Sequence, residues 1–416
     1  MERFEVIVIG AGPSGAVAAA ALASGGARVA MADGSHPREK PCGGGVTRRA
    51  LELIRALSGI DGHPSPDPPV PFAPVGRVRF EAGARAATVP LPAGDLDVFA
   101  REPFDAALVA TAVARGASLI RARATSISRD AGMWTVAFAD GRSATAPWIL
   151  GADGAAGIVR KTVARPFSRS QLSIAAGSYV DAPDIPEIVI RFVDRPRGYL
   201  WSFPRPGHFA VGTCAQADET STREMHAITD AWLDRYAPAA SGHRRRYAWP
   251  IPSLSAGDVD AERPAGNGWL LLGDAAGLVD PITREGIFFA LRSGQLAAAA
   301  LTTANPARQY AAAVRDELYA EVRRAARLKA GFFRPRFTSL LVDALQHSAG
   351  IRDVMIDLVA GRQPYRGLKR RLLRTLEVGL AWQALRQDWA REPRQLSAPG
   401  SRRARARSRR DDGPAR

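Results

Sequence analysis

Cysteine is nearly absent from this 416-residue sequence, which contains only Cys42 and Cys214. Two cysteines cannot form a disulfide framework, and no residues have the ligand spacing of a zinc site, so we expect no bound metal. Their scarcity fits a reducing compartment. The sequence also lacks an uninterrupted apolar run of about 18 residues, the length that a transmembrane helix requires. The first apolar stretch, Phe4–Ile9, is too short for a secretion signal, so we predict a cytoplasmic protein.

Lysine is almost as rare, because only four of the 57 basic residues are lysines. Against 41 acidic residues the net charge is +16, and residues 397–416 contribute 7 − 2 = +5 of it from seven arginines and two aspartates. A basic excess favours anionic partners such as lipid headgroups or nucleic acid, although an arginine-rich composition bias accounts for it equally well. We expect no nucleic-acid partner. The hydrophobic content of 46% is typical of a globular protein with a large core.

The N-terminal sequence predicts a βαβ unit that binds a dinucleotide. A buried-type strand, FEVIVIG, leads through glycines into an alanine-rich helix, and a second strand, ARVAMAD, follows. In the G-x-G-x-x-G pattern the first glycine makes the tight turn, the second lets the backbone approach a pyrophosphate, and the third packs helix against strand. The aspartate that ends the second strand can accept hydrogen bonds from a ribose. The predicted cofactor contacts are Gly10, Gly12, Pro13, Ser14, Gly15 and Asp33.

The rest of the sequence alternates between strand-like and helical patterns. Residues 78–91 predict a hairpin, and residues 97–116 predict a helix. From Leu172 to Trp249 the pattern is that of strands, which indicates an antiparallel sheet inserted between two α/β stretches. Residues 307–390 have helical periodicity. These patterns predict an α/β fold in which a Rossmann-like domain carries an inserted antiparallel-sheet domain and a C-terminal helical region.

Three other stretches distinguish FAD from NAD as the cofactor. VFAREPFDAAL begins at Val98, GADGAAGIVRK at Gly151, and LLLGDAAGLVDPITREGIFFALRSG at Leu270. Together they resemble the motifs of FAD-dependent oxidoreductases with the para-hydroxybenzoate hydroxylase type of fold. The physical argument agrees with this resemblance, because a long cofactor needs polar contacts from several remote segments.

The resemblance implies further cofactor contacts. In that family the aspartate that corresponds to Asp274 binds the ribityl chain, and backbone N–H groups at Gly286 and Ile287 face the isoalloxazine. A helix N-terminus at this point can stabilise negative charge on a reduced flavin. The resemblance also implies that Arg101 touches the cofactor and that the backbone near Ala124 lies against the adenine. Taken alone, an arginine such as Arg101 is more often part of a surface salt bridge, and the ordered set of motifs is what favours cofactor contact.

Two further motifs resemble the geranylgeranyl reductase family, over residues 4 to 385. PRGYLWSFP matches P-x-x-Y-x-W-x-F-P, and KPCGGGVTRRAL matches the family's Cys-Gly-Gly stretch after the second strand. These reductases saturate C=C bonds of isoprenoid chains, so the resemblance implies FAD-dependent reduction of an isoprenoid or other apolar, lipid-like substrate. The residues implied at the flavin and the substrate are Cys42, Gly43, Gly44, Tyr199, Trp201 and Phe203.

The roles of these residues stay open at the level of the sequence. Tyr199, Trp201 and Phe203 alternate along one strand, so their side chains share a face. They would form an aromatic wall for an apolar chain or an ordinary aromatic core. Cys42 is the candidate catalytic residue, as a proton donor to the reduced bond. The alternative is that its thiol only packs beside the cavity or gates it.

Several motifs of related flavoenzymes are missing or changed. No second G-x-G-x-x-G unit is present, so an external reductant such as NAD(P)H or ferredoxin must supply the electrons. Gly277 replaces the histidine of the GDAAH motif of many aromatic hydroxylases, and Tyr199 replaces the first tryptophan of the W-x-W-x-I-P motif of flavin halogenases. An FAD-dependent monooxygenase or halogenase acting on an aromatic or polyketide-like metabolite is nevertheless the alternative prediction. Arg284 stands where the reductases usually have glycine, which argues against their commonest substrate.

These motifs also predict the domain boundaries. The FAD-binding domain comprises residues 1–76, 98–160 and 256–300, the antiparallel-sheet substrate domain 77–97 and 161–255, the C-terminal helical region 301–390, and a disordered basic tail 391–416. Within the helical region, Tyr365–Leu385 has leucines at i, i+4 spacing among basic residues. Such a helix can make a peripheral contact with the anionic inner face of a membrane, or it can cover the core. A third hypothesis is a membrane- or nucleic-acid-binding protein with a vestigial FAD site.

Overall fold

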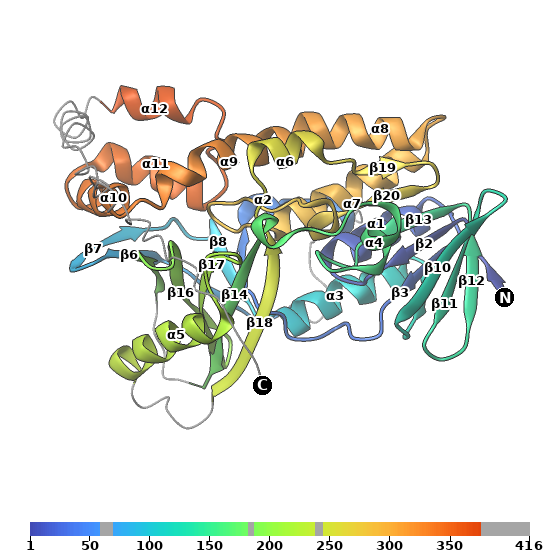
Figure 1. The fold of residues 1–416 in the computed structure, drawn as a ribbon, viewed down its shortest axis with the longest axis horizontal. Coiled ribbons are helices and arrows are strands. Elements are labelled where there is room, and N and C mark those ends of the chain that lie inside the picture. Colours follow the sequence, from blue (N-terminus) through green and yellow to red (C-terminus); the bar gives the residue numbers. More distant parts are fainter. Residues whose placement is uncertain (59–69, 182–186, 238–243, 376–416) are drawn as a thin grey trace, which may run out of the picture. The chain divides into compact units, whose positions relative to one another are not determined.

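The computed structural model describes residues 1–58, 70–181, 187–237 and 244–375 (Figure 1). These residues belong to one unit, Met1–Glu377. The basic tail and the second half of the predicted membrane-facing helix lie outside the described residues. Within the described part of the chain, no helix is long and apolar enough to cross a bilayer.

A six-stranded sheet forms the centre of the N-terminal α/β part. Its order is β19-β20-β13-β2-β3-β9, and all neighbours are parallel except β19 and β20. The strands are β2 (Val6–Ile9), β3 (Val29–Ala32), β9 (Ser118–Ile120), β13 (Trp148–Gly151), β19 (Ala265–Gly266) and β20 (Trp269–Leu271). Every residue of β2 and β3 is buried, as expected of parallel strands. Gly10, Asp33 and Asp274 follow three of these strands at the same edge of the sheet.

Three helices from distant parts of the sequence pack together beside this sheet. They are α1 (Pro13–Ser24), α3 (Arg101–Ala114) and α7 (Ile287–Leu301), and α1 contacts both others. Gly294 permits the close approach of α7 to α1, because a Cβ there would lie 2.6 Å from the carbonyl oxygen of Ser14. The shorter helices of this region are α2 (Arg48–Ser58), α4 (Ile158–Val163), η1 (Arg169–Gln171), α6 (Ala256–Ala261) and η3 (Gly273–Ala276).

A seven-stranded sheet follows the order β18-β14-β17-β16-β15-β6-β7, with every pair antiparallel except β15 and β6. Its strands are β6 (Arg77–Ala82), β7 (Arg85–Pro90), β14 (Leu172–Val180), β15 (Ile188–Val193), β16 (Gly198–Arg205), β17 (His208–Gln216) and β18 (Arg244–Pro252). Figure 1 shows α5 (Thr222–Tyr236) on one side of this sheet and α10 (Pro335–His347) and α11 (Ala349–Val359) on the other, and each side has its own apolar cluster. The predicted α/β fold with an antiparallel sheet and C-terminal helices is confirmed.

The prediction of strands from Leu172 to Trp249 is wrong for Thr222–Tyr236, which form α5. Ser221 caps this helix by accepting the Glu224 N–H, and the Glu224 carboxylate accepts the Ser221 N–H in return. This capping box fixes the helix start, and the buried Leu233 side chain packs in the apolar cluster under the sheet. Local capping therefore overrides the alternating pattern.

Two smaller sheets contain the other described strands. Their strands are β1 (Glu2–Arg3), β10 (Ala124–Asp130), β11 (Met133–Phe138) and β12 (Ser143–Ala146) in one, and β4 (Gly45–Thr47), β5 (Phe72–Pro74) and β8 (Leu96–Phe99) in the other. The helix predicted over residues 97–116 is wrong at its start. Residues 97–99 belong to β8, which pairs with both β4 and β5, and the helix begins only at Arg101.

The first of the C-terminal helices pack near Asp274, and the later ones pack on the seven-stranded sheet. They are α8 (Pro306–Ala313), η4 (Val314–Tyr319), α9 (Ala320–Phe332), α10, α11 and α12 (Leu368–Arg374). The hydroxyl of Tyr310 donates to the carbonyl oxygen of Leu271, and that of Tyr319 donates to Ala276, both at 2.7 Å. Both tyrosines are buried. Their hydroxyls therefore attach the C-terminal helices to the strand and turn on either side of Asp274.

Candidate functional site

The glycine turn has the geometry that a dinucleotide site requires. Gly10 has a φ of +102°, and a Cβ there would lie 2.3 Å from the carbonyl oxygen of Ala152. A Cβ on Gly15 would lie 1.9 Å from the carbonyl oxygen of Gly10. Neither position has room for a side chain, so the strand–turn–helix geometry depends on both glycines.

Gly12 faces a space bordered by basic side chains. The atoms nearest to a Cβ on Gly12 would be His36 Nε2 and Lys40 Nζ, both at 3.8 Å. Helix α1 begins at Pro13 without a side-chain cap and without an acidic residue in its first turn. Its N-terminal N–H groups and Lys40 thus present positive charge to the same space. Burial, followed by the charge of Arg101, lowers the pKa of Lys40, which indicates that its charge lacks sufficient compensation in the protein alone.

Asp33 lies at the end of β3 and is held by the loop that follows. Its Oδ2 accepts the Ala11 N–H at 2.9 Å, and its Oδ1 accepts the N–H groups of Ser35 and His36 at 2.7 and 3.0 Å. His36 Nδ1 lies 3.0 Å from Asp33 Oδ2. Burial opposes ionisation, but His36 and the backbone N–H groups hold the pKa of Asp33 below its ordinary value. Contact with a ribose stays a prediction, and the ribose would share this carboxylate with His36.

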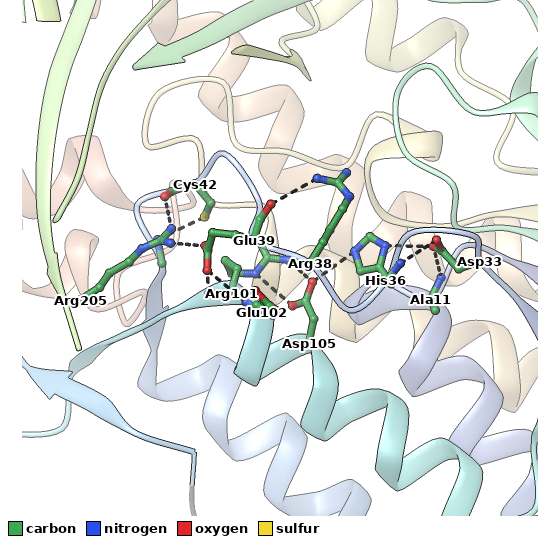
Figure 2. Close-up of polar contacts among 11 residues, drawn as sticks. Ala11, Asp33, His36, Arg38, Glu39, Cys42, Arg101, Glu102, Asp105 and Arg205 are labelled. Atoms are coloured by element: carbon green, nitrogen blue, oxygen red, sulfur yellow. Dashed lines mark hydrogen bonds and ion pairs between the residues drawn. The ribbon is translucent and has the colours of Figure 1, made fainter. Parts of the chain in front are cut away.

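Arg101 is buried and paired rather than exposed. Figure 2 shows its guanidinium beside Asp105, whose two carboxylate oxygens accept from Nε and Nη2 at 3.0 and 2.9 Å. Asp105 is 0% exposed, and it also faces His36 Nε2 at 3.4 Å. Burial alone would raise the pKa of Asp105, yet Arg101 and His36 hold it below its ordinary value. The sequence prediction did not include Asp105, although its i, i+4 spacing from Arg101 on a helix was an available signal.

Arg205 anchors the loop that carries Cys42. Its guanidinium donates to the carbonyl oxygens of Cys42 and Gly43 and pairs with the Glu39 carboxylate, and Figure 2 shows this cluster at one end of the polar contacts that lead to Asp33. The Gly44 N–H donates to Cys42 Sγ at 3.3 Å. The loop is therefore fixed by its backbone, and its thiol takes part as a hydrogen-bond acceptor. No sequence motif singled out Arg205.

A cavity of about 230 Å³ lies against the Cys42 loop. Tyr199, Trp201 and Phe203 of β16 line it, as the strand alternation predicts, although their contact with a substrate stays a prediction. A Cβ on Gly43 would lie 2.9 Å from the Phe203 ring, so the glycine allows the loop to pack on that ring. The Tyr199 hydroxyl donates to the Thr283 carbonyl oxygen at 3.2 Å. Further apolar lining comes from Val78, Phe80, Ile190, Phe192, Phe333 and Met355.

The segment before α7 brings together the other predicted flavin contacts. Gly286 precedes the first residue of the helix, Ile287, and the helix start has neither a side-chain cap nor an acidic residue in its first turn. A Cβ on Gly286 would lie 3.7 Å from Asp274 Oδ1. Glu285 accepts a hydrogen bond from Thr47 Oγ1 at 2.9 Å. This bond links the segment to β4, immediately after the Cys42 loop.

Ala124 begins β10, close to the loop that follows Asp33. A Cβ on Gly34 would lie 2.9 Å from the backbone nitrogen of Arg123, so the two segments are adjacent, as an adenosine contact by both would require. Among the described residues, no group of three or more His, Cys, Asp or Glu side chains could hold a metal ion. Cys42 and Cys214 are both free thiols, and both line the cavity.

The model of a protein family described as an FAD binding domain matches residues 3–304 of this chain. The chain belongs to this FAD-binding family. It is an FAD-dependent oxidoreductase, and its predicted resemblance to geranylgeranyl reductases is confirmed. The geranylgeranyl diphosphate reductase of Rhodobacter capsulatus is 29% identical over 314 residues, covering 72% of this chain and 75% of that protein. The menaquinone reductase of Mycolicibacterium smegmatis is 27% identical over 330 residues, covering 72% and 77%.

Solved structures with the same fold come from more than one functional class. A geranylgeranyl bacteriochlorophyll reductase-like protein from Thermoplasma acidophilum superposes with a TM-score of 0.71 at 20% identity, covering 90% of this chain and 100% of that one. The flavin-dependent brominase Bmp2 superposes with a TM-score of 0.65 at 20% identity, covering 93% and 99%. At these identities the likeness concerns the fold alone.

FAD, which the family implies, fits the residues that are present. The start of α1 at Gly12 is uncapped and lies beside the incompletely compensated Lys40, and we expect the pyrophosphate there. The start of α7 at Gly286 is also uncapped and lies beside Asp274, and we expect the ribityl chain and the flavin ring there. Lys40 was not among the residues predicted from the sequence, because the KPCGGG motif drew attention only to the residues after it.

Proposed function

We propose that this protein uses FAD to reduce a carbon–carbon double bond in an isoprenoid or other apolar, lipid-like substrate. The apolar cavity carries the proposal, because aromatic and aliphatic side chains line it while the Cys42 loop and the segment before α7, residues 282–285, border it. A long hydrocarbon is the ligand that such a lining stabilises. The reductase relatives support the same class of reaction.

Bound FAD would supply hydride-transfer chemistry at this cavity. The chain's own residues would hold the hydrocarbon and exclude water. Tyr199 stacks nearly parallel to Phe333, with ring centroids 6.3 Å apart, and lies 6.0 Å from the Trp201 ring. Burial raises the pKa of Tyr199 well above its ordinary value, so its hydroxyl stays protonated and continues to donate to Thr283. The aromatic wall is therefore fixed in place before the substrate arrives.

Cys42 is the proposed proton donor, because its thiol lines the cavity on a loop that Arg205 holds. Replacing Cys42 by alanine is expected to lower kcat about a hundredfold, within the usual contribution of a general acid, while the bound FAD content stays unchanged. Single-turnover reoxidation of the reduced enzyme by the alkene measures the step directly. Full turnover in the alanine variant would assign the thiol to packing alone.

Anaerobic photoreduction of the FAD-loaded protein, followed by addition of prenyl alkenes, tests the proposed function. We expect the alkene to reoxidise the flavin and to yield a product heavier by two hydrogens. Turnover that instead requires oxygen and yields a hydroxylated or halogenated product would overturn the proposal. That result would identify a monooxygenase or halogenase acting on an aromatic or polyketide-like metabolite.

We further propose that electrons come from an external donor, NAD(P)H or ferredoxin, and that helix α12 contributes a peripheral membrane contact. Leu372 and Leu373 are 38% and 78% exposed beside the basic residues Lys369 and Arg370. We expect the protein to sediment with anionic vesicles more than with neutral ones at low salt, and the Leu373→Gln variant to sediment less. Equal sedimentation with both kinds of vesicle would contradict the membrane contact.

A further inference from the structure

Two basic side chains meet at one buried hydroxyl beside the substrate cavity. Arg284 Nη1 donates to Ser253 Oγ at 2.5 Å, and Lys329 Nζ donates to the same oxygen at 2.7 Å. Lys329 also donates to Gln216 Oε1 at 2.6 Å. Ser253 and the neighbouring Cys214 are each 1% exposed. Within the part of the chain that the structure describes, neither Arg284 nor Lys329 forms a salt bridge with a carboxylate.

This arrangement is unfavourable without an anion. Two like charges that share one acceptor repel each other, and in the described part of the chain no salt bridge to a carboxylate compensates these two half-buried side chains. Burial, followed by the positive charge of Arg284, lowers the pKa of Lys329 to about 8. Asp218 and Glu219 oppose this shift only in part. The repulsion between Arg284 and Lys329 therefore destabilises the ligand-free protein. A negatively charged ligand would reduce this repulsion.

Arg284 also carries a local conformational cost. Its φ is +61°, a left-handed conformation that costs a non-glycine residue free energy. Its side chain lines the cavity, and its Nε is buried without a hydrogen-bond partner. A strained arginine that lines a cavity and keeps an unused buried donor is typical of a binding site, because a ligand can supply the missing acceptor.

We propose that Arg284 and Lys329 form a subsite for the carboxylate of an apolar acid, at the polar end of the substrate cavity. This inference rests on the proposed function and narrows it, since the substrate would then be a hydrocarbon chain that ends in an acid group. A guanidinium donates well to a carboxylate, and Lys329 contributes charge while its N–H groups stay on Ser253 and Gln216. The planar guanidinium can bind a carboxylate through two parallel N–H groups, so we assign a carboxylate to this subsite, and a prenyl monophosphate is the competing ligand in the test.

Calorimetric titration of the FAD-loaded, oxidised protein tests the subsite without any turnover. The probes are a prenyl carboxylic acid, its methyl ester and the corresponding prenyl monophosphate. We expect the acid to bind at least about tenfold more tightly than the ester, which corresponds to about 1.4 kcal/mol. In Arg284→Gly and in Lys329→Gln this preference should fall to about twofold or less, while the ester keeps its affinity. Lys161→Gln is the matched control, because Lys161 is exposed on α4, and it should retain the full preference.

The preference should also depend on pH. Lys329 loses its proton as the pH rises through about 8, so the affinity for the acid should fall above that pH in the wild type and stay level in Lys329→Gln. Burial raises the pKa of the facing Cys214 thiol, which therefore stays neutral near pH 8, and the acidic residues that face Lys329 are Asp218 and Glu219. Lys329 is thus the group in this cluster whose charge changes.

The outcomes separate this inference from the proposed function. Equal affinity for the acid and the ester in the wild type would overturn the subsite, and tighter binding of the monophosphate than of the acid would overturn the carboxylate assignment. A clear acid preference without alkene reduction would support the subsite and reject the reductase. Thermal melting serves as a folding control, since Arg284→Gly removes the left-handed arginine and should melt no lower than the wild type.

Discussion

Replacing Gly15 by alanine is expected to give a protein that retains no FAD and unfolds far more readily than the wild type. The new Cβ would lie 1.9 Å from the carbonyl oxygen of Gly10, a backbone atom that cannot move without displacing the turn. Overpacking typically costs about 1–3 kcal/mol and occasionally more, and we expect the upper end here because the clash is with backbone. Urea unfolding and the visible flavin absorbance of the purified protein measure the two effects. Retention of FAD at wild-type stability would contradict the packing at this turn.

Gly12→Ala is expected to weaken FAD binding without affecting folding. A Cβ there would make only ordinary contacts, at 3.8 Å from His36 and Lys40, so the protein should fold normally. FAD should bind at least about tenfold more weakly, because the methyl group would occupy the space that the pyrophosphate needs. Gly331→Ala is the general glycine control. It lies in α9 with open space around it, and alanine there should stabilise the protein by about 0.5–1 kcal/mol.

Replacing Arg101 by methionine is the second change with a large expected effect. It would leave Asp105, which is 0% exposed, without its bidentate partner. Loss of one member of a buried ion pair costs about 3–5 kcal/mol. Urea unfolding at a fixed FAD concentration measures the loss. Arg142→Met, which breaks an exposed ion pair with Asp140, should leave the unfolding midpoint unchanged.

A double variant distinguishes a role of Arg101 in protein stability from a role in cofactor contact. Arg101→Met combined with Asp105→Leu removes both charges, and apolar replacement of a buried pair is often close to neutral. We therefore expect more than half of the lost stability to return, although His36 would lose one of its two carboxylate neighbours. FAD affinity should stay reduced if Arg101 contacts the cofactor. Recovery of both properties would show that Arg101 acts only through Asp105.

Sequence patterns correctly predicted those elements of the fold that depend on residues close together in the sequence. The first βαβ unit and the β6–β7 hairpin follow from periodicity and from short glycine-containing turns. Helix α5 was missed because a capping box at Ser221 and Glu224 starts a helix inside a sequence with strand-like alternation. Strand β8 was assigned to a helix because its conformation depends on pairing with β4 and β5, which are distant in the sequence.

The candidate site likewise has features that local sequence motifs predicted and contacts that they did not. Motifs located the glycine turn, Asp33, Asp274 and the Cys42 loop, because each depends on residues that are consecutive or nearly so. The contacts of Lys40 with the glycine turn, and of Arg205 with the Cys42 loop, arise only when remote segments come together. The shared hydroxyl of Ser253 is a further example, since its two cationic partners follow it by 31 and 76 residues. No local pattern indicates such a cluster.

The tyrosine hydroxyls of α8 and η4 limit how this enzyme can be divided or recombined. The family match ends at residue 304, yet Tyr310 and Tyr319 lie beyond it and hold the backbone on either side of Asp274. A fragment that ends with the match would leave two buried carbonyl groups without donors. Exchange of C-terminal helices between relatives must therefore preserve both hydroxyls, because α8 and η4 hold the backbone around the predicted FAD contact Asp274, whereas Phe333 and Met355, which line the apolar cavity, come later in the chain.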